Sequence, residues 1–539
     1  MADMPILALS DVTIALPQGS DRAHAVRNLS LNVSAGECVC LVGESGSGKS
    51  VTGMAALGLL PAALRHVSGT IAFDGAPLDP ALRGREIGMI FQEPTASLDP
   101  IMRVGDQIEE VLLVHGLRGR AARRARALEL LRAVQLPDPE RIHRAYPHQV
   151  SGGQAQRIVI AMALAFDPKL LIADEPTTAL DVTTQAEILQ LVRGLQRERG
   201  AGLLFITHDL GVVADIADHV IVMQQGVAVE EGPAAQVLSN PSHPYTRKLL
   251  AALPRRRAPR PIAKPLPEPV LEARGVTVTY RTAKGLFGHS EVAAVRDVSL
   301  TLRRGQTHGI VGESGSGKSS LMRALLHLEP RDAGTVCIQG TDTEQWGTRL
   351  PRHIRQRLQI VLQDPYTALN PRQRIGDTVA EAARIHGASS EEAQNRAKAL
   401  LENVGLSEQA FQRYPHEFSG GQRQRICIAR ALATEPDILI ADEAVSALDV
   451  SIQAQILALF RDLQERLGFA MLFVTHDLRV ASAICDEITV MRSGSVVEQG
   501  PMEQIFDTPS APYTRSLLAA IPGNAGQATP EPVTTAEAI

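Results

Sequence analysis

Two copies of the octapeptide GESGSGKS are the residues of this chain best placed to do chemistry. Each copy fits the pattern GxxxxGK[ST], follows a short apolar run and opens a segment of helical pattern, which is the context that a phosphate-binding loop requires. Its glycines let backbone N–H groups approach phosphates, its lysine bridges the β- and γ-phosphates, and its last serine ligates Mg²⁺. The predicted nucleotide-binding residues are Gly43, Ser45, Gly46, Gly48, Lys49 and Ser50 in the first copy and Gly312, Ser314, Gly315, Gly317, Lys318 and Ser319 in the second.

A pair of acidic residues follows a second apolar run in each copy. Beside a phosphate-binding loop, such a pair indicates that the nucleotide is hydrolysed as well as bound. The pairs are Asp174 with Glu175, and Asp442 with Glu443. An aspartate at the end of a strand that faces a phosphate loop can hold Mg²⁺ through water. The glutamate beside it can polarise the attacking water as a general base. An isolated Asp-Glu pair is more often a solvated strand end, but the repetition in matching context favours catalysis.

One histidine ends a further apolar strand in each copy, His208 in the first and His476 in the second. At that place a histidine can contact the γ-phosphate and hold the attacking water in line. A lone histidine is usually a surface or core residue. Because both histidines recur in the same motif, THDL, we predict that they are catalytic.

The elements that position these residues are also duplicated, since five motifs, GESGSGKS, SGGQ, ADE, THDL and PYTR, each recur 268 or 269 residues later. A period of this length means two copies of a whole domain rather than a solenoid. Between the copies, arginine and proline alternate, which favours an extended and solvated linker. The predicted division is a first nucleotide-binding domain at 1–252, a linker at 253–269, a second domain at 270–522 and a disordered tail at 523–539.

Each copy has the pattern of an α/β domain. Short apolar runs such as Cys38–Val42, Leu170–Ala173 and Leu203–Thr207 suit buried parallel strands. Helical patterns lie between them, and the charged segments 105–135 and 376–404 indicate an inserted helical subdomain. We therefore expect βαβ units around a mostly parallel sheet.

Composition narrows the class of protein. Aromatic residues make up 3% of the 539 residues and the formal net charge is −5, so we expect no nucleic-acid partner. No apolar run approaches the roughly 18 residues of a membrane span, and no secretory signal is expected. The five cysteines form no CxxC pair, which argues against a zinc ribbon, an iron–sulfur site and a disulfide framework.

Together the motifs resemble the ATP-binding domain of ABC transporters, twice over. The element SGGQ, at Ser151–Gln154 and Ser419–Gln422, discriminates most sharply, because other phosphate-loop ATPases lack it. The resemblance covers roughly 5–252 and 270–522. It implies ATP as the nucleotide and two P-loop NTPase domains of ABC type. Each domain is expected to have a mostly parallel sheet core, an antiparallel β subdomain and an inserted helical subdomain.

The resemblance also implies roles for residues that no other argument singles out. Gln92 and Gln363 match the glutamine that contacts Mg²⁺ and senses the membrane partner, and Tyr280 matches the aromatic residue that stacks on adenine, where the first copy offers Leu16. In the family, SGGQ serves the ATP of the opposite domain. Each composite site would therefore take residues from both copies. The first would combine Lys49, Gln92, Asp174, Glu175 and His208 with Ser419, Gly420, Gly421 and Gln422. The second would combine Lys318, Gln363, Asp442, Glu443 and His476 with Ser151, Gly152, Gly153 and Gln154.

A Pro-Tyr-Thr-Arg segment follows each core, at Pro244–Arg247 and Pro512–Arg515, and resembles the ATP-binding subunits of peptide and nickel importers. The chain thus looks like a fusion of two such subunits, as in importers for glutathione and peptide-linked microcins. This branch implies an ATPase that energises an importer, expected to carry peptides, with two permease subunits and a substrate-binding protein. It would sit peripherally at the cytoplasmic face of the bacterial inner membrane. Many relatives carry an iron–sulfur cluster beyond the core, but no cysteine follows Cys485, so we predict none here.

Other functions stay open at the level of sequence. A soluble tandem ABC ATPase acting on ribosomes would usually have a long charged helical linker, and one acting on DNA would carry zinc-binding cysteines. Within transport, a sugar importer lacks the Pro-Tyr-Thr-Arg segment, and a carbon–phosphorus lyase system has ATPase subunits that resemble this branch. The solute cannot be deduced, since the binding protein and the permeases contact it.

Overall fold

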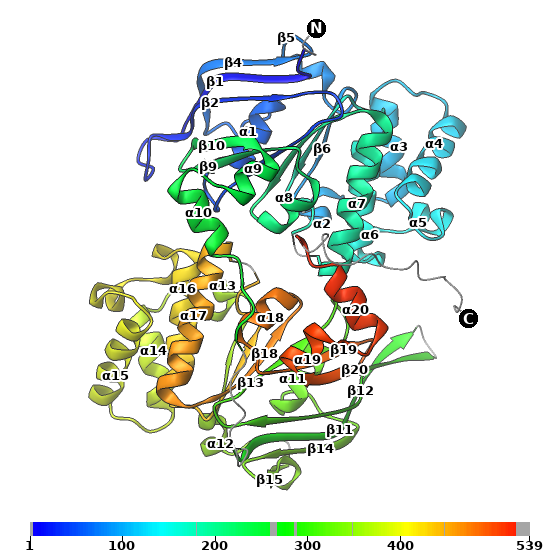
Figure 1. Cartoon of the computed structure of the whole chain (residues 1–539). Helices are drawn as coiled ribbons and strands as arrows, with labels where there is room; N and C mark the ends of the chain where they lie inside the picture. The colour runs from blue at the N-terminus through cyan, green and yellow to red at the C-terminus, as the bar shows by residue number, and fades with distance from the viewer. Residues whose placement is uncertain are drawn as a thin grey trace. The chain divides into compact units, whose positions relative to one another are not determined.

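Two parallel-sheet cores organise the chain, one in each half, as the computed structural model shows (Figure 1). The chain divides into a first unit that contains residues 4–253 and a second that contains 254–519. The structure describes residues 4–178, 180–258, 267–284, 288–347, 349–446 and 448–523. Residues 259–266 of the predicted linker, and the predicted tail beyond 523, lie outside the described residues.

The core of the first unit is a six-stranded sheet in the order β10-β9-β3-β8-β7-β6. All neighbours are parallel except β10, which pairs with β9 antiparallel. The strands are almost entirely buried apolar runs, as a sheet covered on both faces requires. Their bounds are β3 Cys38–Val42, β6 Ile87–Ile90, β7 Leu170–Asp174, β8 Gly202–Thr207, β9 His219–Gln224 and β10 Val227–Pro233.

A second sheet, antiparallel and four-stranded, completes this core. Its order is β2-β1-β4-β5, with bounds β1 Leu7–Ala15, β2 His24–Val33, β4 Arg65–Phe73 and β5 Ala76–Pro77. Its inner face and that of the parallel sheet share one cluster of buried residues with α1 (Lys49–Ala56). The antiparallel sheet therefore covers the face of the core on which the phosphate-loop helix lies.

The helical subdomain is inserted between β6 and α6, and Figure 1 shows α3, α4 and α5 grouped beside the sheet. Helices α3, α4 and α6 share a buried apolar cluster with α7. The helices of the first unit are α2 Pro94–Ser97, α3 Val104–Val114, α4 Arg120–Ala133, α5 Pro139–Arg144, α6 Gly152–Ala163, α7 Val182–Arg199, α8 Leu210–Ile216, α9 Ala234–Ser239 and α10 Pro244–Ala251.

The second unit repeats this plan, with sheets in the orders β16-β17-β18-β13-β19-β20 and β12-β11-β14-β15. The predicted fold class is confirmed in both halves. The strands are β11 Pro269–Lys284, β12 Gly288–Arg303, β13 Thr307–Val311, β14 Ala333–Ile338, β15 Thr341–Asp342, β16 Leu358–Val361, β17 Ile438–Asp442, β18 Ala470–Thr475, β19 Glu487–Arg492 and β20 Ser495–Pro501. The helices are α11 Lys318–Leu325, α12 Arg352–Arg357, α13 Pro365–Ala368, α14 Ile375–Ile385, α15 Ser390–Asn403, α16 Gly420–Leu432, α17 Val450–Leu467, α18 Leu478–Ile484, α19 Met502–Asp507 and α20 Pro512–Ala519.

Two arginines at the start of the linker pack onto the second unit. The Arg257 guanidinium lies 2.5 Å from the Asp486 carboxylate, and the Arg257 side chain is only 11% exposed. Arg256 donates to both carboxylate oxygens of Asp507, at 2.5 and 2.7 Å. This part of the linker is therefore packed rather than solvated, because the second unit supplies carboxylates that match its charge.

Candidate functional site

The lysine of each phosphate loop is buried at the carboxyl end of the central strand. Lys49 is 4% exposed, and its Nζ donates to the carbonyls of Gly43 and Glu44 at 2.8 and 2.9 Å. Lys318 makes the equivalent bonds in the second unit, both at 2.7 Å. Glycine is required before each lysine. Gly48 has φ 104°, and a Cβ there would collide with a backbone carbonyl.

The two predicted general bases share an unusual backbone conformation. Glu175 has φ 45° and Glu443 has φ 46°, a left-handed region that costs a non-glycine residue about 1–3 kcal/mol. A hydrogen bond to the neighbouring strand holds each in place, from Glu175 N–H to Ile206 O and from Glu443 N–H to Val474 O, both at 2.9 Å. The turn directs each glutamate out of its strand at the edge where the phosphate loop lies.

In the first unit, three side chains converge on the Glu175 carboxylate. Gln92 Nε2 donates at 3.1 Å, Thr178 Oγ1 donates at 3.0 Å, and His208 Nδ1 lies 3.1 Å away. Burial alone would raise the pKa of Glu175, but the hydrogen bond and charge of His208, with the charge of Lys49, lower it overall. Glu175 is therefore ionised at neutral pH and able to accept a hydrogen bond from water.

In the second unit, the Glu443 carboxylate has the same two polar neighbours. Gln363 Nε2 donates to it at 3.0 Å, and His476 Nδ1 lies 3.3 Å away. Burial opposes both charges, yet the contact lowers the pKa of Glu443 and raises the pKa of His476. The structure thus brings together the glutamine, glutamate and histidine that the sequence predicted in each copy.

Oxygen ligands suited to Mg²⁺ lie beside each phosphate loop. Ser50 Oγ donates to Asp174 Oδ1 at 3.0 Å, whereas Asp442 Oδ1 is buried without a hydrogen-bond partner among the described residues. Burial, together with the adjacent glutamate, raises the pKa of Asp174 and of Asp442. A hard cation would favour the charged carboxylates, and hydroxyl and carboxylate oxygens are its preferred ligands. The residues therefore fit a magnesium ion.

Both SGGQ elements form the N-terminus of a long helix. Ser151 caps α6 and exchanges hydrogen bonds with Gln154, at 3.3 and 3.1 Å, and Ser419 does the same with Gln422 at the start of α16. Such an N-terminus presents partial positive charge to an anion. Thr184 packs closely against Gly153, since a Cβ at residue 153 would lie 2.7 Å from the Thr184 methyl group.

Strand register places Leu16 and Tyr280 at equivalent positions. Leu16 N–H bonds to Ala23 O next to the β1–β2 pairing, and Tyr280 pairs with Val292 at the matching point of β11–β12. The Tyr280 hydroxyl donates to Ser320 Oγ at 3.3 Å, one residue past the phosphate loop. Tyr280 thus lies beside the second loop, and stacking on adenine stays a prediction.

The sequence argument missed one residue that contacts the first phosphate loop. Tyr245 Oη accepts a hydrogen bond from Glu44 N–H at 3.2 Å. Tyr513 occupies the same place in the second unit, where burial and then the charge of Glu313 raise the pKa of its phenol. Both tyrosines belong to the Pro-Tyr-Thr-Arg segment, whose recurrence at the spacing of the ATP motifs was the available signal.

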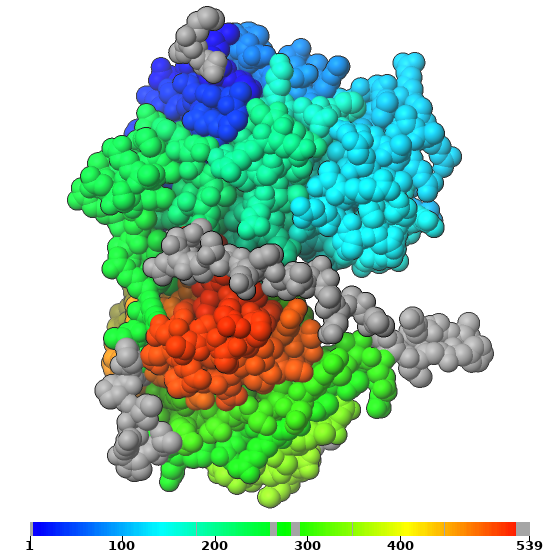
Figure 2. All heavy atoms as spheres, turned by 45° about the vertical axis from the view of Figure 1, so that its right-hand side comes forward, coloured from blue at the N-terminus to red at the C-terminus, as the bar shows by residue number. Residues whose placement is uncertain are grey.

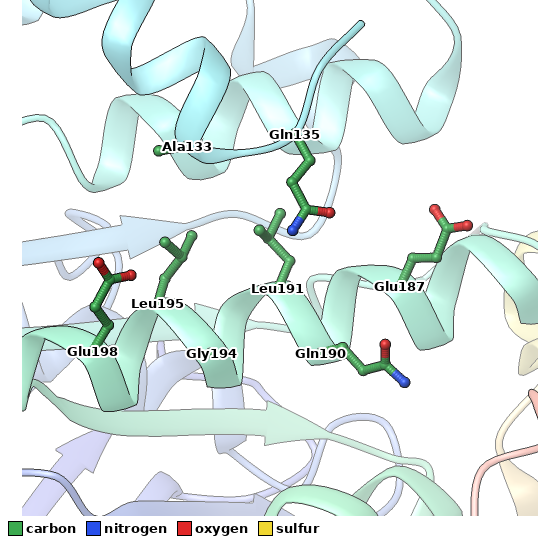
Figure 3. A pocket seen from close by; sticks show the side chains of 8 residues that line it. All are labelled: Ala133, Gln135, Glu187, Gln190, Leu191, Gly194, Leu195 and Glu198. Atoms are coloured by element: carbon green, nitrogen blue, oxygen red, sulfur yellow. The ribbon is translucent and has the colours of Figure 1, made fainter. Parts of the chain in front are cut away.

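The first unit also has a pocket away from the predicted ATP-binding residues. It has a volume of about 370 Å³, lies along α7 between Glu187 and Glu198, and faces Gln135 (Figure 3). It contains none of the predicted ATP-binding residues.

Comparison with known proteins agrees with the geometry. The family model described as "ABC transporter" matches residues 26–178 and again 295–446. The chain belongs to the ABC transporter family. A second model, "Oligopeptide/dipeptide transporter, C-terminal region", matches residues 229–274 and 497–537, which include the Pro-Tyr-Thr-Arg segments.

Full-length relatives share the tandem organisation. The chain is 47% identical over 529 residues to a peptidoglycan transport ATP-binding protein, YejF, of Agrobacterium fabrum, covering 96% of both chains. It is 45% identical over 561 residues to the glutathione import ATP-binding protein GsiA of Escherichia coli K12, covering 96% of this chain and 89% of GsiA. A solved ATP-binding cassette in a post-hydrolysis state, bound to ADP and Pi, is 29% identical; the match covers 43% of this chain and 98% of that one with a TM-score of 0.38.

This ABC protein is an ATPase coupled to transport. The comparisons support neither a ribosome- or DNA-directed ATPase, nor a sugar importer, nor a carbon–phosphorus lyase component. The roles of individual site residues, and the absence of an iron–sulfur cluster, stay predictions.

Proposed function

We propose that the chain is the ATP-hydrolysing subunit of an importer for peptides or closely related solutes. The observation that carries this proposal is the oligopeptide/dipeptide region, which follows the ATPase core in both halves. Relatives named for glutathione import and for peptidoglycan transport handle solutes with peptide character. A peptide bond or free peptide terminus is the chemistry that such solutes share.

The residues divide the work of hydrolysis as follows. Lys49 neutralises phosphate charge, and Ser50 with Asp174 would hold Mg²⁺, which when bound offsets charge on the β- and γ-phosphate oxygens. Glu175 accepts a proton from the attacking water, and His208 holds that water in line. The equivalent residues in the second unit act in the same way.

We further infer that each ATP is completed by the SGGQ helix of the other half. The support is the charge of an exposed helix N-terminus at Ser151 and Ser419, together with the family resemblance. In this arrangement neither half hydrolyses ATP alone. A fused chain keeps the two halves at a fixed one-to-one ratio.

An apolar groove in the first unit would dock a permease. It has a volume of about 390 Å³ and lies between the core and the helical subdomain, lined by apolar side chains that include Leu57, Phe91, Val111 and Met162. Phe91 precedes Gln92, which bonds to Glu175. A permease segment in this groove would therefore lie one residue away from the catalytic carboxylate network, a short path for coupling.

These partners imply a location. The described residues contain no helix long and apolar enough to cross a membrane. We propose that the chain is held peripherally at the cytoplasmic face of the inner membrane by two permease subunits, which receive solute from a substrate-binding protein.

Reconstitution with the permeases and binding protein tests this function. ATP hydrolysis should rise when a di- or oligopeptide is present with the binding protein. Stimulation by a sugar or by nickel alone, with none by any peptide, would contradict the proposed solute class while leaving the ATPase assignment intact.

A further inference from the structure

Large apolar side chains are exposed at matching positions of the two units, and in the first unit they line the proposed permease groove. Exposed apolar residues that recur in both copies indicate a surface that a partner covers. Their exposed fractions lie between 39% and 73%, for Leu59, Phe91 and Val114 in the first unit and Leu328, Leu362 and Ile385 in the second.

In the first unit, Glu110 of α3 lines the groove from the helical side, and a cluster of exposed arginines follows farther along the chain. Val114 and His115 line the groove, and the chain then turns into α4. Arg118, Arg120 and Arg124, on this turn and the first turn of α4, are exposed, and no acidic residue lies between 116 and 128. We call residues 116–124 the first helical rim. In Figure 2 the helical subdomain that contains this rim is the cyan part of the molecule, and it lies at the surface in that view.

The first helical rim is held in shape by its own backbone contacts. Arg123 Nη1 donates to the carbonyls of Leu117 and Arg118, at 3.4 and 2.5 Å, and its Nε lies 3.9 Å from Glu109. Arg123 thus fastens the turn and is partly neutralised. The three exposed arginines beside it remain available to a partner.

The equivalent rim of the second unit, residues 387–395, has the opposite charge. It contains Glu391 and Glu392 and no basic residue. Ser389 N–H donates to Glu392 Oε2 at 2.9 Å, and this bond lowers the pKa of Glu392, so the Glu392 carboxylate is charged at neutral pH. On the core side, Arg83 lines the first groove, and the second unit exposes Arg352 and Arg355 on α12. The segments 116–124 and 387–395 therefore differ in the sign of their charge, although Glu110 lines the first groove and Arg384 is exposed beside Ile385.

We propose that these oppositely charged rims select the two permeases. The permease that docks on the first unit presents acidic residues to the first helical rim, and the other permease presents basic or neutral residues to 387–395. The inference rests on the proposed docking of permeases in the groove. Like-charge contacts penalise the exchanged arrangement, so the fused chain would bind each permease at one half only.

Site-specific photo-crosslinking in the full transporter tests the selection. A crosslinking residue replaces Val114 in one preparation and Ile385 in another, and each should capture a different permease. In the first preparation, the triple variant Arg118→Glu, Arg120→Glu and Arg124→Glu should reduce capture at least about tenfold, since reversal adds repulsion to lost attraction. Capture from position 385 should not change. The matched triple lysine variant keeps the charge and should restore capture at 114.

The possible outcomes distinguish failure of the charge selection from failure of the proposed permease docking. Capture of permeases at both positions with no effect of charge reversal would overturn the selection and leave the docking intact. Failure of both positions to capture any permease would overturn the docking itself. Sedimentation of the chain with anionic phospholipid vesicles lacking permeases, abolished by the triple glutamate variant, would make the lipid surface the occupant and also overturn the proposal.

Discussion

The two predicted ATP sites contain the same candidate catalytic residues, but the hydrogen bonds to the two glutamates differ. In the first unit Thr178 donates to the Glu175 carboxylate, whereas in the second Ser446 donates to the backbone carbonyl of Glu443, at 3.0 Å in each case. Leu16 stands in the first unit where Tyr280 stands in the second. The duplicated domain therefore keeps the glutamine, glutamate and histidine in both copies, while the contacts around these residues differ.

A second difference lies far from the phosphates. In the first unit Asp218 accepts from Cys38 N–H, which opens the central strand, and pairs with Arg193 of α7 at 2.7 Å. In the second unit Asp486 accepts from the equivalent Thr307 N–H, but its arginine comes from the linker, Arg257. The equivalent carboxylate is thus paired with an arginine of a core helix in the first unit, and with an arginine that precedes the core, in the predicted linker, in the second.

The largest expected effect falls equally on both sites. Glu175→Gln and Glu443→Gln should each slow hydrolysis at their own site by roughly 10²–10⁴-fold, because the general base is lost. Binding of ATP should persist, since the phosphate loops are unchanged. Single-turnover hydrolysis in the reconstituted transporter measures this. Near wild-type turnover in either variant would show that the two copies do not share the assigned chemistry.

The stacking difference should appear as unequal affinity for ATP. A base stacked on an aromatic side chain is worth about 1–3 kcal/mol. We expect Tyr280→Ala to weaken ATP at the second site and Leu16→Tyr to tighten it at the first. Titration of a fluorescent nucleotide resolved by site provides the measurement. Unchanged affinity in both variants would remove this distinction between the units.

The linker difference should appear as unequal stability. Arg257→Ala leaves Asp486 half-buried without its guanidinium, at a cost of about 1–3 kcal/mol to the second unit. Arg255→Ala, two residues away in the same linker, is the matched control. Hydrogen exchange of the full chain should show faster opening in β13 and α18 only for Arg257→Ala. Equal exchange in the two variants would mean that the linker contact does not support the domain.

The smallest effect concerns the orientation and charge of the glutamates. Thr178→Val removes one hydrogen bond to Glu175, worth about 1 kcal/mol, and should slow the first site severalfold. The same bond helps to lower the pKa of Glu175. Its loss should therefore move the acidic limb of the first site's pH–rate profile to higher pH. Ser446→Ala should leave the second site's profile in place, and an equal shift in both would contradict the comparison.

Much of this could be predicted from the sequence, because the motifs carry their structural context with them. A phosphate loop implies the strand before it and the helix after it, and the recurrence of five motifs implied the second domain. Tyr245 was missed, since its bond to Glu44 joins residues about two hundred positions apart and follows from no local pattern. The packing of Arg257 was missed for a similar reason. Its partner Asp486 lies more than two hundred residues away in the sequence, and the two meet only in the folded domain.

The charge difference between the helical rims is visible in the sequence, but the sequence alone gives it no functional interpretation. Arginines in α4 and glutamates in α15 both suit a solvated helix. Only the proximity of Val114 and His115 to the apolar groove turns that difference into a statement about partners.

Uptake of a labelled peptide into proteoliposomes that contain the chain, its two permeases and the binding protein tests the central claim most directly. With ATP on the side of this chain, the wild type should accumulate peptide, and the double variant Glu175→Gln with Glu443→Gln should bind ATP yet accumulate none. Accumulation by the double variant equal to that of the wild type would contradict the account that these two sites energise import.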